Sequence, residues 1–262
     1  MRNLVTIISS LLSLSLLMSC AAASNVPPTR IGDYISPEHK TGDESLSRIE
    51  QRPLQAGLVL ISDTSDPGAA PNLPDEAFVR LGESLKQDIE RTIPVTIKEV
   101  IPADHIMPQP SGDWAQFADL ARQRQLDYLA VVIVSSTEQE YPVTVFLGWT
   151  THAQPGFRRD NWSLLEFALL DLKNNRTLMQ AEGRGWATLD RPTAPGINQW
   201  YPVVYLRPGD PVQRYWPPTY EGAPNTLRVL SFDQAEKRLT VKLQNSWITQ
   251  LEADAAASKS SS

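Results

Sequence analysis

The stretch Tyr128–Val134, which reads YLAVVIV, is the most hydrophobic segment that the sequence predicts to be a strand. It is rich in β-branched side chains and shows no alternation between apolar and polar positions. This composition is typical of a strand in a sheet that is covered on both faces. We therefore expect Tyr128–Val134 to lie at the centre of the sheet.

Two strands and two helices are predicted ahead of this stretch. The strands are expected at Ala56–Ser62 and Val95–Ile101, and the helices at Pro74–Arg91 and Trp114–Arg124. Apolar residues recur at helical spacing in both helices, and proline suits the first turn of the first. The order β-α-β-α-β favours strands laid side by side with helices covering the faces, which is an α/β (α+β) fold.

Antiparallel strands are expected to follow. The sequence predicts a strand at Val143–Thr151, a polar loop at His152–Asn161, and a hairpin formed by Trp162–Leu172 and Leu178–Leu189. The first strand of this set carries Val143 and Val145 on one face.

The register of the hairpin can be argued from side-chain size and charge. Large apolar residues on one strand are expected to face small residues on the other: Leu165 opposite Gly185, Phe167 opposite Gly183, and Leu169 opposite Ala181. The same register places Glu166 opposite Arg184 and requires an odd-numbered loop around Asn175. The glycines are interpreted as allowing close packing against Phe167.

The chain ends with a proline-rich, aromatic segment at 191–224 and a helix and tail at 225–262, the helix being expected at Thr226–Ala256. Tyrosine and tryptophan are the residues of interface hot spots. The aromatic residues of this segment are therefore the candidate partner-binding residues: Trp200, Tyr201, Tyr205, Tyr215, Trp216 and Tyr220. The alternative is that they wrap the sheet and complete its core.

The first residues indicate export. Arg2 precedes an apolar run at Leu4–Met18 that is short for a membrane-spanning helix, as in a signal peptide. Leu17-Met18-Ser19-Cys20 resembles a bacterial lipobox, in which the chain is cut before a cysteine that is then lipidated. The alternative is an ordinary signal peptide cut after Ala22 or Ala23. Cys20 is the one cysteine of the chain, so no internal disulfide can form.

The resemblance to lipoproteins implies an address and a division of the chain. Ala21 follows the cysteine where an aspartate often retains such proteins at the inner membrane, which implies the outer membrane, facing the periplasm. The expected parts are a signal peptide (1–19), a flexible tether (20–52), an α/β domain (53–190), the proline-rich segment (191–224), and the C-terminal helix and tail (225–262).

The domain itself also resembles a family. The β-α-β-α-β unit leads to a hairpin reading EFALLDLKNNRTLMQAEGRG at 166–185. This resembles the α/β domain shared by envelope lipoproteins related to the curli-secretion channel, the TolB N-terminal domain and the outer-membrane activators of peptidoglycan synthases. In that family an Asp-x-x-x-Gly pattern is common; Asp171 matches it, and Asn175 stands where glycine is usual.

Composition and motifs exclude several kinds of site. The formal net charge of −6 argues against nucleic acid as a partner. The three histidines share no metal-ligand spacing, and no phosphate-binding or nucleophile motif occurs, so we expect no cofactor, no metal and no catalytic residue. The best of poor catalytic candidates are Glu138, Glu140 and His152. Arg158 and Arg159 are expected on the surface.

Three functional hypotheses remain. The first is a non-catalytic, lipid-anchored lipoprotein of the cell envelope that binds or positions a partner protein in envelope assembly. The second is a periplasmic hydrolase acting on glycan or peptide. The third is a structural spacer.

Overall fold

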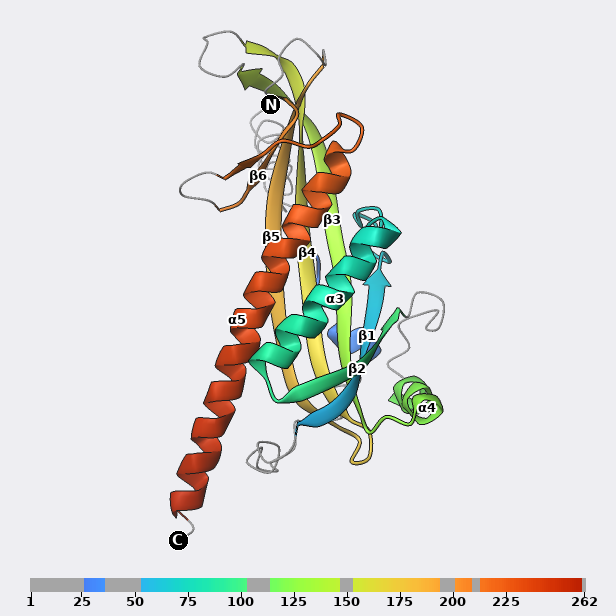
Figure 1. Ribbon diagram of the computed structural model, residues 1–262. Coiled ribbons are helices and arrows are strands. Elements are labelled where there is room, and N and C mark those ends of the chain that lie inside the picture. Colours follow the sequence, from blue (N-terminus) through green and yellow to red (C-terminus); the bar gives the residue numbers. More distant parts are fainter. Residues whose placement is uncertain are drawn as a thin grey trace, which may run out of the picture.

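A curled sheet of seven strands and four helices make up the computed structural model, which describes residues 26–35, 53–102, 114–146, 153–193, 201–208 and 213–260 (Figure 1). The strands are β1 (Leu54–Asp63), β2 (Val95–Pro102), β3 (Tyr128–Phe146), β4 (Ala153–Asp171), β5 (Arg176–Pro192), β6 (Val203–Leu206) and β7 (Arg214–Tyr215). The helices are α2 (Ile31–Tyr34), α3 (Asp75–Thr92), α4 (Trp114–Arg124) and α5 (Ala223–Ser260). The predicted mixed α/β fold with a long C-terminal helix is confirmed.

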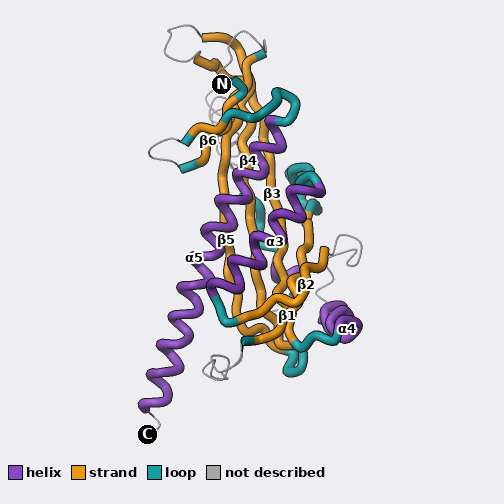
Figure 2. Tube along the Cα trace, in the orientation of Figure 1, coloured by secondary structure: helices purple, strands orange, loops and turns teal. Residues whose placement is uncertain are grey.

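The strand order is β2-β1-β3-β4-β5-β6-β7, with β1 parallel to both β2 and β3 and all later pairs antiparallel. The chain moves outward from β1 to β2 and then back past β1 to β3. Right-handed crossovers in opposite directions place their helices on opposite faces of the sheet. Accordingly, α3 lies beside α5 on one face, and α4 belongs to the core of the other face (Figures 1 and 2).

The two faces explain the unbroken apolar run in β3. Ala130, Val132 and Val134 pack into the core below α3 and α5. Leu129, Val131 and Ile133 alternate with them and pack into the core below α4. Side chains that alternate along a strand point to opposite faces, so both sets must be apolar. β3 also pairs with a strand on each side, which confirms the predicted central position.

β3 and β4 are longer than the sequence predicts. The prediction of a separate strand at 143–151 and a polar loop at 152–161 is wrong for 143–146, which continue β3, and for 153–161, which belong to β4; residues 147–152 lie outside the described residues. The polar residues that were predicted to form the loop instead lie in β4 and pair with residues of β3. Arg159, for example, faces Glu140. Opposite charges at facing positions stabilise a sheet, so charged residues here mark a solvated half of the hairpin.

The predicted register of the β4–β5 hairpin is wrong by two residues. The observed pairs are Leu165 with Gly183, Glu166 with Glu182, Phe167 with Ala181, and Leu169 with Met179. The predicted odd loop is also wrong, because four residues separate Asp171 from its partner Arg176. A bulge between Leu169 and Leu170 leaves Leu178 as an extra residue of β5 without a facing partner.

The glycines of β5 serve α5 rather than Phe167. A Cβ atom at Gly183 would overlap the carbonyl oxygen of Ala235, and one at Gly185 would overlap that of Ser231. Glycine is the residue that permits such close approach of two backbones. Side chains of α5 also bond to β5: the side-chain oxygen of Gln234 accepts from Trp186 N, and Arg238 donates to Arg184 O, both at 2.8 Å.

The prediction of a flexible tether is wrong for residues 26–35. Tyr34 and Ile35 are buried in the α4-side core. The backbone N–H groups of Arg30 and Ile31 donate to the Glu166 carboxylate at 2.7 and 3.1 Å, and the Tyr34 hydroxyl donates to Asp63 at 3.1 Å. The sequence shows no hydrophobic period in this segment. Its docking could not be predicted, because the residues that hold it, Glu166 and Asp63, are distant along the chain. Cys20 and the rest of the predicted tether lie outside the described residues.

None of the helices in the described part of the chain has both the length and the apolarity needed to cross a bilayer.

Candidate functional site

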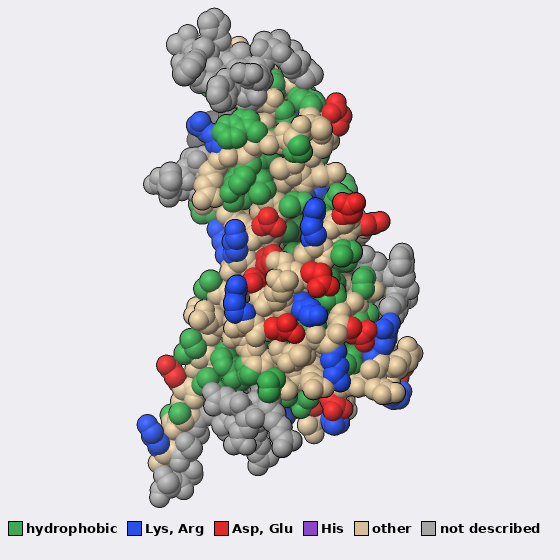
Figure 3. Space-filling view, viewed as in Figure 1, with side chains coloured by type: hydrophobic (Ala, Val, Ile, Leu, Met, Phe, Trp, Pro, Cys, Tyr) green, Lys and Arg blue, Asp and Glu red, His purple; other side chains and the backbone are tan. Residues whose placement is uncertain are grey.

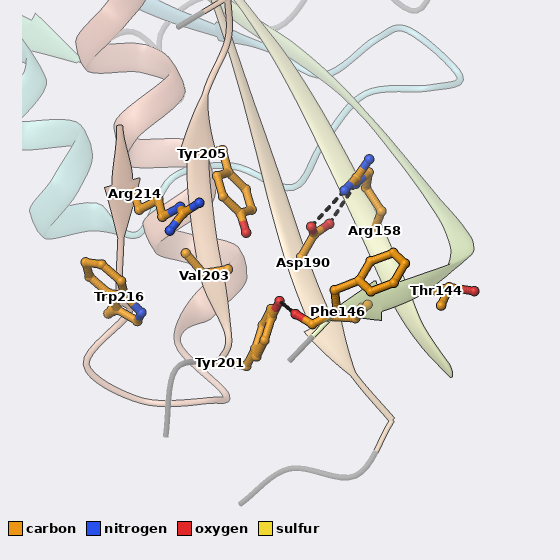
Figure 4. A pocket seen from close by; sticks show the side chains of 10 residues that line it. Thr144, Phe146, Arg158, Asp190, Tyr201, Val203, Tyr205, Arg214 and Trp216 are labelled. Carbon is orange, nitrogen blue, oxygen red and sulfur yellow. Dashed lines mark hydrogen bonds and ion pairs between the residues drawn. The ribbon is translucent and has the colours of Figure 1, made fainter. Parts of the chain in front are cut away.

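A cavity of about 300 Å³ lies where the far ends of β3, β4 and β5 meet the segment around β6 and β7 (Figure 4). Its lining comes from five separate stretches of sequence: Thr144, Val145, Phe146, Arg158, Asp190, Tyr201, Val203, Tyr205, Arg214 and Trp216. The long β3–β4 hairpin provides one wall, and the proline-rich segment provides the other.

Aromatic side chains dominate this cavity. Tyr201, Tyr205 and Trp216 come from the predicted partner-binding set, and Phe146 joins them from the end of β3. Phe146 is 61 % exposed and Trp216 is 51 % exposed. Exposed aromatic residues gathered around a cavity are typical of a binding surface, because singly scattered ones are the norm elsewhere.

A fixed ion pair lies in the same cavity. The Arg158 guanidinium donates to both carboxylate oxygens of Asp190, at 2.6 and 2.7 Å. Asp190 is buried, and its hydrogen bonds raise the pKa of Arg158 above its usual value. Two parallel bonds of this kind fix the orientation of both side chains. The pair therefore provides a rigid polar wall without a free charge.

The two tyrosines are held neutral. Burial, followed by the charge of Asp190, raises the pKa of Tyr205 to about 12 and also raises the pKa of Tyr201. The Tyr201 hydroxyl donates to the carbonyl oxygen of Phe146, which ties the loop before β6 to the end of β3 (Figure 4). Arg207 lies over the Tyr205 ring, 5.3 Å from its centroid. The phenol groups thus act as hydrogen-bonding groups and as apolar surface at neutral pH.

Two other members of the predicted set, Tyr215 and Tyr220, are not among the residues that line this cavity. Tyr215 packs against a small core cluster below the first turns of α5, and its hydroxyl donates to Gln213 at 2.9 Å. The Tyr220 hydroxyl donates to Pro192 O at 2.8 Å. Trp200 lies outside the described residues. Some aromatic residues of the segment therefore pack against the core and others line the cavity, and the partner-binding role of the set stays a prediction.

Phe146 is an aromatic residue of the cavity that the sequence analysis did not single out. A signal was present: Val143 and Val145 mark the inward face of that stretch, so Phe146 stands on the opposite face. A large aromatic residue on the polar face of a strand is a candidate for binding. Arg158 and Asp190 gave no such signal, because their pairing depends on the β4–β5 register.

The candidate catalytic residues Glu138 and Glu140 form ion pairs away from this cavity. Glu138 accepts from the buried Arg228 of α5 at 2.6 Å, and Arg159 lies 3.7 Å away. Glu140 accepts from Arg159 at 2.8 Å and from Arg191 at 3.1 Å. Carboxylates that are paired in this way are poorly suited to proton transfer. His152 lies outside the described residues.

No metal centre is evident in the described ranges, where no three His, Cys, Asp or Glu residues come together in a way that could hold a metal ion.

Comparisons with known proteins give limited similarity. No family model matches the chain, and no curated protein matches it significantly. Among solved structures, a putative neuraminyllactose-binding hemagglutinin homolog from Helicobacter pylori aligns over 78 % of this chain and 90 % of its own, with 8 % identity and a TM-score of 0.38.

Two further structures are similar at the same low level. A hypothetical protein from Chlamydia trachomatis aligns over 73 % of this chain and 97 % of its own, with 12 % identity and a TM-score of 0.30. A PelC dodecamer from Paraburkholderia phytofirmans aligns over 70 % and 90 %, with 14 % identity and a TM-score of 0.24. Similarities of this size carry no argument about function.

Proposed function

We propose that this protein is a non-catalytic lipoprotein of the cell envelope, anchored through Cys20 and facing the periplasm from the outer membrane. Its domain binds or positions a partner protein. The lipobox-like sequence Leu17-Met18-Ser19-Cys20 supports the anchor, and the aromatic cavity supports the partner.

The observation that carries the proposal is the placement of Phe146 and Trp216. Both side chains are more than half exposed, and both line one cavity whose polar wall is fixed by the Arg158–Asp190 pair. Aromatic anchors around a preformed pocket lose little conformational entropy on binding and bury a large apolar area. A protein partner with an apolar side chain at its contact point fits this arrangement.

The carboxylates argue against the hydrolase alternative. A pair of acids that cleaves a glycosidic bond needs one protonated and one free carboxyl group on either side of the substrate. Glu138 and Glu140 instead accept hydrogen bonds from Arg228, Arg159 and Arg191. They are better explained as the structural link between the hairpin and α5.

Photo-crosslinking in the intact envelope tests partner binding. A benzoylphenylalanine residue at position 216 should capture a defined protein, identified by mass spectrometry. The same group at position 79 is the matched control, because Val79 is 57 % exposed on α3, away from the cavity. Phe146→Ser should reduce the crosslink at least tenfold, since hot-spot residues contribute about 2 kcal/mol or more. Equal capture from both positions, or no effect of Phe146→Ser, would contradict the proposal.

Metabolic labelling tests the anchor separately. Radiolabelled palmitate should appear on the wild-type protein and be absent from the Cys20→Ser variant, and the mature chain should begin at Cys20. A processed form that lacks Cys20 would disprove lipid attachment while leaving the crosslinking result standing.

A further inference from the structure

A second cavity, of about 290 Å³, lies between α3 and α5. One part of its lining is apolar and includes Leu73, Ala77 and Phe232. The other part carries Arg80, Asp233 and Glu236. Figure 3 shows that acidic and basic side chains gather over these two helices on this face of the molecule.

Glu236 is the distinctive residue of this cavity. The residue is 6 % exposed, and its Oε1 atom has no hydrogen-bond partner within the described part of the chain. Burying a carboxylate oxygen without a partner is costly, so such atoms are rare in folded proteins. Another feature of the functional protein is therefore expected to compensate it.

The surroundings of Glu236 hold too little positive charge. Burial raises its pKa to about 7, and the charges of Asp88 and Asp233 act in the same direction. A hydrogen bond with Ser84 and the charge of Lys237 lower its pKa, but by less. The ionised form of this carboxylate is therefore poorly stabilised by its surroundings, and a cation beside it would favour that form.

The neighbouring acids differ from Glu236 in their partners. Asp88 forms an ion pair with Arg91 at 2.7 Å and accepts a hydrogen bond from Thr240 at 2.9 Å. Burial raises the pKa of Asp233, and the positive charges of Lys237 and Arg80 oppose that rise. Among the described acids of this cavity, Glu236 is the one with a buried carboxylate oxygen that has no hydrogen-bond partner.

We propose that the cavity between α3 and α5 binds a small alkylammonium ion, with its hydrocarbon part against Leu73, Ala77 and Phe232 and its charged end directed to Glu236. The volume lies at the small end of the range for ligand sites, which suits a short-chain amine. The apolar lining selects against small inorganic cations, which need several oxygen ligands. This inference does not rest on the function proposed above.

Calorimetry with three matched probes tests the site. Pentylamine should bind the purified protein saturably, whereas pentanol and pentanoate, which have the same chain without the positive charge, should bind at least tenfold more weakly. Glu236 is about one-tenth ionised at pH 6 and about nine-tenths at pH 8, so pentylamine should bind about tenfold more tightly at pH 8. This second comparison needs no variant.

Substitution then identifies the carboxylate. Glu236→Gln should weaken pentylamine binding at least tenfold and remove its pH dependence. Glu83→Gln, which changes an exposed acid on the same helix pair, should leave both unchanged. The proposal is overturned if pentylamine does not bind saturably, if pentanol binds as tightly, or if Glu236→Gln binds pentylamine like the wild type.

Discussion

Gly183 and Gly185 allow the backbone of α5 to contact that of β5. A methyl group at either position would overlap a carbonyl oxygen of the helix, at Ala235 or Ser231. Because those oxygens belong to a packed helix, they cannot move as the end of a flexible side chain can. The two glycines therefore determine how closely the helix approaches the sheet, and so where Arg228 and Glu236 lie.

Gly185→Ala should lower the free energy of unfolding by about 2 kcal/mol or more, because overpacking at a rigid contact is costly. Urea denaturation followed by circular dichroism measures the change. Gly32→Ala is the control, since a methyl group there has no neighbour within 4 Å, and its midpoint should stay close to that of the wild type. An unchanged midpoint for Gly185→Ala would show that α5 does not pack as described.

The sequence predicted close packing at these glycines but assigned the wrong partner. The register argument had only size and charge within the hairpin to use, and it matched Gly183 to Phe167. The residue that leaves no room for a side chain at Gly183 is Ala235, which lies 52 positions later in the sequence. No local pattern connects the two.

At the level of the elements, β3 and β4 extend past the core into a half that ion pairs stabilise. Arg159 bonds to Glu140, Arg191 reaches Glu140 from β5, and Arg228 reaches Glu138 from α5. The sequence predicted the apolar halves of both strands correctly, but it took the polar part of β4 for a loop and the end of β3 for a separate strand. The sequence alone does not distinguish a charged residue in a strand from one in a loop, because the difference lies in the residue that pairs with it. This limits what hydrophobic periodicity can predict.

The contact between α3 and α5 should be more stable in mild acid. Burial raises the pKa of Glu236 to about 7 from an ordinary value near 4.5, so the folded protein binds this proton more tightly than the unfolded chain does. Stability should therefore fall as pH rises from about 4.5 to about 7, by roughly 1–3 kcal/mol, and stay lower above that range. The raised pKa of Glu166 acts in the same direction.

Thermal unfolding between pH 5 and pH 8 measures this effect. Glu236→Gln should be more stable than the wild type at pH 8 and should lose most of the difference at pH 5. Glu83→Gln should follow the wild type. A wild-type protein that is equally stable at both values, with no gain from Glu236→Gln at pH 8, would contradict the raised pKa.

At the scale of the whole molecule, the sheet has a covered face on each side, and the N-terminal segment completes one of them. α3 and α5 cover the first face; α4 and residues 26–35 cover the second. The sequence predicted side-by-side strands with helices on the faces from the β-α-β-α-β pattern, and the central place of β3 from its apolar run. The docking of residues 26–35 could not be predicted in this way, because Glu166 and Asp63, which hold them, are far along the chain.

Removing residues 20–35 from the mature chain should uncover apolar surface beside α4, lower the melting temperature by several degrees and increase binding of a hydrophobic dye. Hydrogen exchange should speed up in β1 and β4 beside the lost segment. Asp33→Asn, which alters an exposed charge of the same segment, is the control. If the truncated protein has the same melting temperature as the full mature chain, the segment contributes nothing to the stability of the fold.

The docked segment 26–35 also limits how far the domain can lie from a membrane to which Cys20 is anchored. Five residues lie between Cys20 and Val26, the first described residue, and the six residue steps of a fully extended chain reach about 20 Å. A lipid on Cys20 would thus keep the domain within about 20 Å of the membrane surface. A loose chain to residue 52 would allow a distance several times as large. A partner anchored in the same membrane could contact the domain laterally. A partner anchored in the opposite membrane would itself have to extend across most of the space between the two membranes.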